Sequence, residues 1–88
     1  MNRNEAITLA KSKGAVVTKV EKYESRKEGF SFTAVGKRFT VNGHEVSHDG
    51  FGGCACWKLD GKQAGYGYET DCILAAIGIK SSRGILQE

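Results

Sequence analysis

The sequence predicts a single α+β domain, with an antiparallel sheet of about five strands and one helix at each end packed on one sheet face. Three observations predict it. With 88 residues, 40% of them apolar and none of them proline, the chain can build one modest core. Helical patterns flank a central region in which apolar and polar residues alternate. Asn42-Gly43 and Asp60-Gly61, dipeptides typical of tight hairpins, divide that region.

The first helix is predicted over residues 3–13. Asn2 and Glu5 have the spacing of a capping box, in which the Asn2 side chain accepts a hydrogen bond from the Glu5 amide. Gly14 supplies the residue type at which helices end. The β-branched residues of 16–20 predict a first strand, whereas the polar stretch 23–29 predicts a surface loop or a hairpin connection.

A second strand is predicted from Phe30, with apolar side chains at even positions until Gly36 and at odd positions afterwards. Because a period of two cannot change face without an extra residue or a turn, we expect a bulge or bend at Gly36. We expect Phe30, Phe32 and Trp57 to build the core, since the chain has few other large apolar residues. The alternative is that exposed aromatics on a basic face stack on nucleic-acid bases.

The two hairpin dipeptides predict the register. Around Asn42-Gly43 one face carries the pairs Val41–His44, Phe39–Val46 and Lys37–His48, and the wet face carries Arg38, Thr40, Glu45 and Ser47. Around Asp60-Gly61, a strand over 54–59 is expected to oppose 62–67. One face of this second hairpin is then aromatic, and the glycine-flattened other face carries Cys54, Cys56, Lys58 and Gln63.

The second helix is predicted to begin with Thr70 as its N-cap. Its residues 72–77 are apolar all the way round, so it needs cover from the sheet and from something else. Residues 80–88 predict a tail that either frays or docks.

Charge is distributed unevenly along the chain. Residues 1–38 carry nine Lys or Arg and four Glu, whereas residues 39–88 carry four basic and six acidic residues. This asymmetry leaves a nucleic-acid-binding accessory domain that uses the basic N-terminal half as an alternative function. The order of elements and the 57–67 segment are similar to double-stranded-RNA-binding domains, which approach phosphates with lysines at the start of the last helix. Here Glu69-Thr70-Asp71 stands at that place.

Four residues are candidates for metal or thiol chemistry, namely His44, His48, Cys54 and Cys56. Their H-x3-H-x5-C-x-C spacing is not that of a familiar zinc site, and the predicted register makes the four diverge. We therefore expect no cofactor, with a small zinc protein as a further alternative. Cys72 lies near the predicted start of a helix, where the helix dipole favours a reactive thiolate, but its acidic neighbours disfavour the thiolate.

The function expected is a non-enzymatic binding or regulatory module, inhibitor-like or adaptor-like, that contacts a protein partner or a second copy of itself. We see no catalytic constellation, no secretory signal and no membrane segment, and the three cysteines favour reduced thiols in the cytoplasm. The candidate partner-binding residues are Lys58, Gln63, Cys54, Cys56, Lys37 and Arg38.

Overall fold

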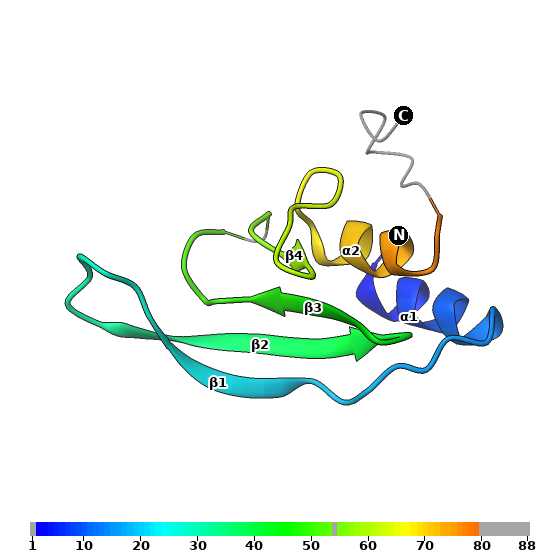
Figure 1. The fold of residues 1–88 in the computed structure, drawn as a ribbon, viewed down its shortest axis with the longest axis horizontal. Coiled ribbons are helices and arrows are strands. Elements are labelled where there is room, and N and C mark those ends of the chain that lie inside the picture. The colour runs from blue at the N-terminus through cyan, green and yellow to red at the C-terminus, as the bar shows by residue number, and fades with distance from the viewer. Residues whose placement is uncertain (1, 54, 80–88) are drawn as a thin grey trace.

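The computed structural model describes residues 2–53 and 55–79, and within them it confirms the α+β class. Four antiparallel strands lie in the order β1-β2-β3-β4, rather than about five, and two helices accompany them. The strands are β1 (Glu21–Arg26), β2 (Thr33–Val41), β3 (His44–His48) and β4 (Lys58–Leu59), and the helices are α1 (Arg3–Ser12) and α2 (Glu69–Ala76). Both helices lie above the part of the sheet next to the β2–β3 turn, and the β1–β2 hairpin extends past them (Figure 1).

Helix α1 has the predicted capping box. The Glu5 amide donates to Asn2 Oδ1 at 2.9 Å, and the Asn2 amide donates to Glu5 Oε1 at 2.9 Å. The helix ends one residue earlier than predicted, and Gly14 follows it with φ of +86°. Local chemistry is therefore sufficient to place this element.

The core forms between the helices and the half of the sheet that they cover. Ala6 and Ala10 of α1 are fully buried, and these small side chains let α1 lie close to its neighbours. The buried cluster is completed by Phe39, Val41, Val46, Cys72, Ile73 and Ala76. Helix α2 thus obtains the extra cover that its composition requires from α1, β3 and β4 of the same chain.

The predicted first strand is wrong. Residues 16–20 make only one isolated bridge, Val17 to Val41, and β1 lies where a loop or hairpin connection was expected. The ladder is interrupted because the Thr18 hydroxyl, rather than a backbone carbonyl, accepts the Thr40 amide at 2.8 Å. Strand β1 has no apolar alternation to reveal it, since it is an edge strand that exposes side chains on both faces.

The predicted bulge at Gly36 is also wrong. The β1–β2 register runs without a break from Glu21↔Arg38 to Arg26↔Thr33. Glycine is required for a different reason: Gly36 lies opposite Tyr23, and a Cβ at Gly36 would collide with the Tyr23 ring. The apolar side chains change position because the sheet leaves the core there, and neither Phe30 nor Phe32 is a core residue.

The first hairpin register is confirmed at every predicted pair, with Asn42 and Gly43 at φ of 55° and 86°. The second turn also forms, with Asp60 and Gly61 at φ of 51° and 83°. Its long strands do not. The Trp57 amide donates to the Gly67 carbonyl at 2.8 Å and not to its expected partner Ala64. Strand β4 is therefore limited to two residues, which pair with β3. Residues 55–67 therefore do not form the predicted aromatic and glycine-flattened faces, and Cys54 lies outside the described residues.

Helix α2 begins at Glu69, with Tyr68 rather than Thr70 at the N-cap and no side-chain cap bond. The Asp71 carboxylate, buried in the first turn, instead accepts the Tyr66 amide at 3.1 Å and holds the preceding loop. The predicted tail, 80–88, lies outside the described residues. Neither described helix has the length and apolar character that crossing a membrane requires.

Candidate functional site

The free end of the β1–β2 hairpin carries a cluster of three phenylalanines, Phe30, Phe32 and Phe51, which we call the aromatic tip. Phe30 and Phe32 meet edge to face with ring centroids 5.6 Å apart, and both contact Phe51 at 5.0 and 5.5 Å. Phe51 is 6% exposed, whereas Phe30 and Phe32 are 48% and 56% exposed. The tip is thus a supported apolar surface that lies outside the core.

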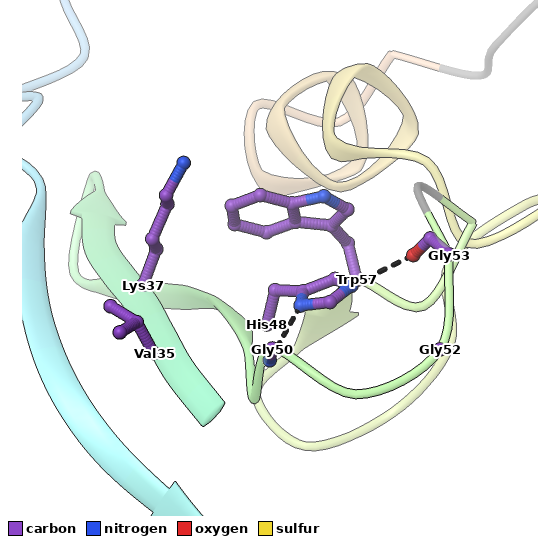
Figure 2. Close-up of a pocket in the computed structure, with 7 residues that line it drawn as sticks. All are labelled: Val35, Lys37, His48, Gly50, Gly52, Gly53 and Trp57. Carbon is purple, nitrogen blue, oxygen red and sulfur yellow. Dashed lines mark hydrogen bonds between the residues drawn. The ribbon is translucent and has the colours of Figure 1, made fainter. Parts of the chain in front are cut away.

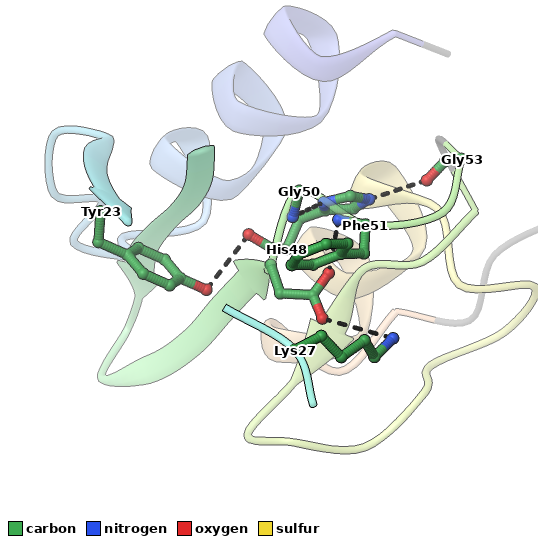
Figure 3. A network of polar contacts seen from close by, with 7 residues as sticks. Tyr23, Lys27, His48, Gly50, Phe51 and Gly53 are labelled. Atoms are coloured by element: carbon green, nitrogen blue, oxygen red, sulfur yellow. Dashed lines mark hydrogen bonds and ion pairs between the residues drawn. The ribbon is translucent and has the colours of Figure 1, made fainter. Parts of the chain in front are cut away.

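His48 organises the loop that brings Phe51 to the tip (Figure 3). The Gly50 amide lies 2.8 Å from Nδ1, and because an amide N–H only donates, Nδ1 is the acceptor. The ring proton therefore sits on Nε2, which donates to the Gly53 carbonyl at 2.8 Å. Both ring nitrogens are occupied by backbone, so His48 positions residues 49–53.

Two further contacts tie this loop to the hairpin. The Tyr23 hydroxyl donates to the His48 carbonyl at 3.2 Å, and Lys27 Nζ lies 3.9 Å from Asp49 Oδ2 (Figure 3). Asp49 Oδ1 also accepts the Phe51 amide at 2.9 Å. Burial, with a smaller contribution from the Asp49 charge, raises the pKa of Tyr23, so this hydroxyl remains a donor at neutral pH. The tip is held from both sides.

The predicted partner-binding residues do not form one surface. Lys37 faces the helix side of the sheet, whereas Arg38 and Lys58 are register partners of Ser47 on the opposite face. Arg38 covers the Tyr23 ring at 5.0 Å and pairs with Glu21 at 3.4 Å. Gln63 donates to the Gly65 carbonyl at 3.2 Å, and Cys54 lies outside the described residues.

The candidate zinc ligands are not brought together in the described part of the chain. His44 and His48 stand four residues apart on β3, roughly 13 Å along a strand. His44 Nδ1 lies 2.8 Å from Asp60 Oδ2, an interaction that lowers the pKa of Asp60. Cys56 is half-buried, and residues 2–53 and 55–79 hold no group of three His, Cys, Asp or Glu side chains placed to share a metal ion.

The Cys72 thiol is enclosed by the core rather than exposed at the helix start. Burial raises its pKa to about 12, and the neighbouring Asp71 charge adds to this effect. A neutral thiol without access is a poor nucleophile, so Cys72 acts as a small core side chain.

The sequence pattern favoured Phe30 and Phe32 as core residues because they alternate as a buried strand would, and the exposed-aromatic alternative, which included both, did not group them with Phe51. The signal available was Ser31-Phe32-Thr33 following the charged 24–28 stretch, which is unusual for the approach to a core strand. Only the contact with Phe51, nineteen or more residues away, shows that the rings gather at one end of the molecule.

Comparison with known proteins found no family model, no curated protein and no solved structure that matches this chain. The likeness to double-stranded-RNA-binding domains stays a likeness in the order of elements.

Proposed function

We propose that this chain is a non-enzymatic binding module that docks its aromatic tip on a protein partner. The observation that carries the proposal is the pair Phe30 and Phe32, each about half exposed at the end of a projecting hairpin. Contiguous exposed apolar surface is typical of interaction sites. Each of these rings leaves roughly 1 kcal/mol of burial free energy unrealised in the isolated chain.

The way the tip is held favours docking. Hydrogen bonds from His48 and Asp49 fix the loop under Phe51, and the Phe51 ring in turn supports Phe30 and Phe32. A surface that is ordered before it meets its partner loses less conformational entropy on binding. A hairpin end also reaches a concave partner surface more readily than the flat face of a sheet.

Charge indicates the kind of partner. Residues 19–38 carry six Lys or Arg and three Glu, so this segment alone has the net charge of +3 that the whole chain carries. Rim charges of one sign favour encounter with a surface of the opposite sign. The partner proposed is thus a protein with an apolar pocket surrounded by acidic side chains.

Two of the candidate reactive side chains, His48 and Cys72, have structural roles that favour a binding function over a catalytic one. His48 uses both nitrogens on backbone groups, His44 is paired with Asp60, and Cys72 is buried. The apolar surface of helix α2 is covered within the chain, so this helix gives no support to a further interface. The proposal therefore depends on the tip alone.

The test compares the full chain with a Phe30→Ser/Phe32→Ser variant and with Val16→Ser. Val16 is a matched control because it is apolar and 69% exposed but does not belong to the tip. Each protein is immobilised and presented with extract of the source cells, with and without nuclease treatment, and its captured proteins are quantified by mass spectrometry. We expect one acidic protein to be retained in stoichiometric amount by the wild type and Val16→Ser, and lost from the tip variant.

Three outcomes would contradict the proposal. Equal capture by the tip variant would remove the tip from binding. Loss of all capture on nuclease treatment, together with a steep salt dependence of binding, would favour the nucleic-acid alternative. A concentration-dependent dimer that the tip substitutions dissolve, measured by analytical ultracentrifugation, would show that a second copy occupies the tip.

A further inference from the structure

Two adjoining hollows lie where the β1–β2 hairpin leaves the cover of the helices, and they share the side chains of Lys37 and Trp57. The first, of about 340 Å³, is shown in Figure 2. Its other lining residues are Val35, His48, Gly50, Gly52 and Gly53. The second, of about 280 Å³, is lined by Arg3, Val20, Lys22 and Glu69 in addition to the shared pair. The first hollow lies at the lower end of the range of small-ligand sites, about 300–1,000 Å³, and the second lies just below that range.

The first hollow has an aromatic wall that is held in place. The Trp57 ring packs on His48 with centroids 5.3 Å apart and meets Phe39 at 6.3 Å, while the Trp57 amide is bonded to Gly67. In Figure 2 the indole stands above His48, with Lys37 and Val35 on the opposite side of the hollow. Val35 is 59% exposed, and the remaining wall is glycine. A planar ring is the shape that such a wall accommodates.

The second hollow has an excess of positive charge. Arg3 Nε is paired with Glu69 Oε2 at 2.9 Å, and the Lys37 charge also acts on the Glu69 carboxyl. The lining therefore holds Arg3, Lys22 and Lys37 against one carboxylate. No carboxylate of residues 2–53 and 55–79 forms an ion pair with either lysine. Glu24 stands on the same face by register but lines neither hollow. The local balance of lining charges favours an anion.

The placement of the two lysines strengthens this argument. Lys22 and Lys37 are direct cross-strand partners in the β1–β2 register, and both line the same hollow. Like charges directly opposite each other on a sheet destabilise it. An anion bound between the two ammonium groups would remove that repulsion.

We propose that these hollows form a nucleotide site, in which the base lies against Trp57 and a phosphate lies between Lys22 and Lys37. The shared lining of the two hollows places aromatic wall and cations next to each other, as a ring joined to a phosphate requires. The same chemistry is offered by a free mononucleotide and by one unit of a single-stranded nucleic acid. The first hollow shares the His48 loop with the support of the aromatic tip, but Phe30, Phe32 and Phe51 line neither hollow, so separate variants test the two proposals.

Trp57 is the only tryptophan of the chain, so its fluorescence reports on this site. We would titrate the full chain with AMP, adenosine and inorganic phosphate, then with a short single-stranded oligonucleotide. AMP is expected to change the Trp57 emission with at least tenfold higher affinity than adenosine or phosphate alone. Tighter binding per nucleotide by the oligonucleotide identifies a single strand as the source, and equal or weaker binding identifies the free nucleotide.

Variants test the placement of the phosphate. Lys22→Gln and Lys37→Gln are each expected to weaken AMP binding about fivefold, the size of a partly exposed charge interaction. Lys13→Gln is the matched control, because it removes the same charge at the far end of α1, roughly 15 Å from Arg3. Glu69→Gln is expected to tighten AMP binding, a gain that impaired folding cannot produce.

The proposal is overturned by several distinct results. Equal affinity for AMP and adenosine would mean that the lysines do not read a phosphate, and equal affinity for AMP and phosphate would mean that Trp57 does not read a base. An equal loss in Lys13→Gln would show attraction by net charge alone. Unchanged Trp57 emission with all ligands, together with unshifted amide resonances of Lys37 and Gly53, would show that nothing binds there.

Discussion

The two halves of the sheet share strand β2 but have opposite surroundings. At its end, Phe39 and Val41 are buried beneath the helices. At its beginning Thr33 and Val35 are exposed, β1 pairs with them, and the loop at Gly50 approaches the Val35 carbonyl. We call the uncovered half, made of β1 and residues 33–37, the overhang. A small chain that leaves nearly half of its sheet uncovered has surface in excess of what folding needs.

Different kinds of contact stabilise the two halves. The covered half is held by apolar packing among small and branched side chains. The overhang is held by backbone pairing, by Tyr23 over Gly36, and by the polar contacts of His48 and Asp49. Stability should therefore depend on side-chain volume in one half and on hydrogen bonds and close approach in the other.

The largest effect is expected for Ile73→Ala in the covered half. Ile73 is fully buried, so the substitution leaves a cavity and should lower the free energy of unfolding by about 3 kcal/mol. Val35→Ala in the overhang should lower it by less than about 0.5 kcal/mol. Urea unfolding followed by circular dichroism measures both, and similar losses would erase the distinction between the halves.

Gly36→Ala should give the next largest effect. The added methyl group meets the Tyr23 ring, which is held by its bond to the His48 carbonyl, so we expect a loss of about 1–2 kcal/mol. Gly53→Ala is the control, because a Cβ at Gly53 meets no atom within 4 Å. Comparable melting temperatures for the two variants would show that Tyr23 does not require the glycine.

His48→Ala should destabilise the molecule by about 1 kcal/mol through the loss of its two hydrogen bonds to backbone. Its sharper signature is local: amide hydrogen exchange at Gly50 should accelerate, while exchange in α2 follows only the global change. His48→Asn retains an acceptor near the Gly50 amide and should slow that exchange again. Unchanged exchange at Gly50 in His48→Ala would argue against this role of the ring.

The smallest effect concerns Glu69, which lies at the boundary of the two halves. Burial raises its pKa, and the charges of Arg3 and Lys37 oppose the shift without cancelling it. Because the pKa of Glu69 is higher in the folded state than in the unfolded state, this group favours folding when the pH is below the unfolded-state pKa of about 4.5. The contribution is lost as the pH rises through the folded-state pKa. Glu69→Gln should therefore be slightly more stable than the wild type at neutral pH and equal to it near pH 4. If the wild type instead gains stability relative to Glu69→Gln as the pH rises from 4 to 7, the ionised Glu69 carboxylate stabilises the fold and the prediction is wrong.

Features encoded within a few residues were predictable. The capping box of Asn2 and Glu5 and the turn at Asn42-Gly43 depend only on local geometry, and the turn carried the whole β2–β3 register with it. The all-apolar character of α2 correctly indicated burial on several sides, although it did not show that α1 supplies the second cover.

Features that depend on distant partners were not predictable. Gly36 was predicted to be a bulge because the residue that requires a glycine there, Tyr23, lies thirteen residues earlier in a segment whose sequence does not indicate a strand. The Thr18 hydroxyl that interrupts the edge ladder, and the Gly67 carbonyl that shortens β4, likewise act across the fold. For the site, the side chains of Lys37 and Trp57 were visible in the sequence, but the hollows that they share arise from the overhang itself.

We propose that the aromatic tip serves for binding, and we expect it to contribute little to the stability of the fold. Urea unfolding of Phe30→Ser/Phe32→Ser, beside the wild type, tests this most directly. We predict that the free energy of unfolding falls by no more than about 2 kcal/mol, because each ring is about half exposed and its buried half contributes only about 1 kcal/mol. A loss of 3 kcal/mol or more, on the order of a deleted core side chain, would place the tip in the folding core and contradict the account.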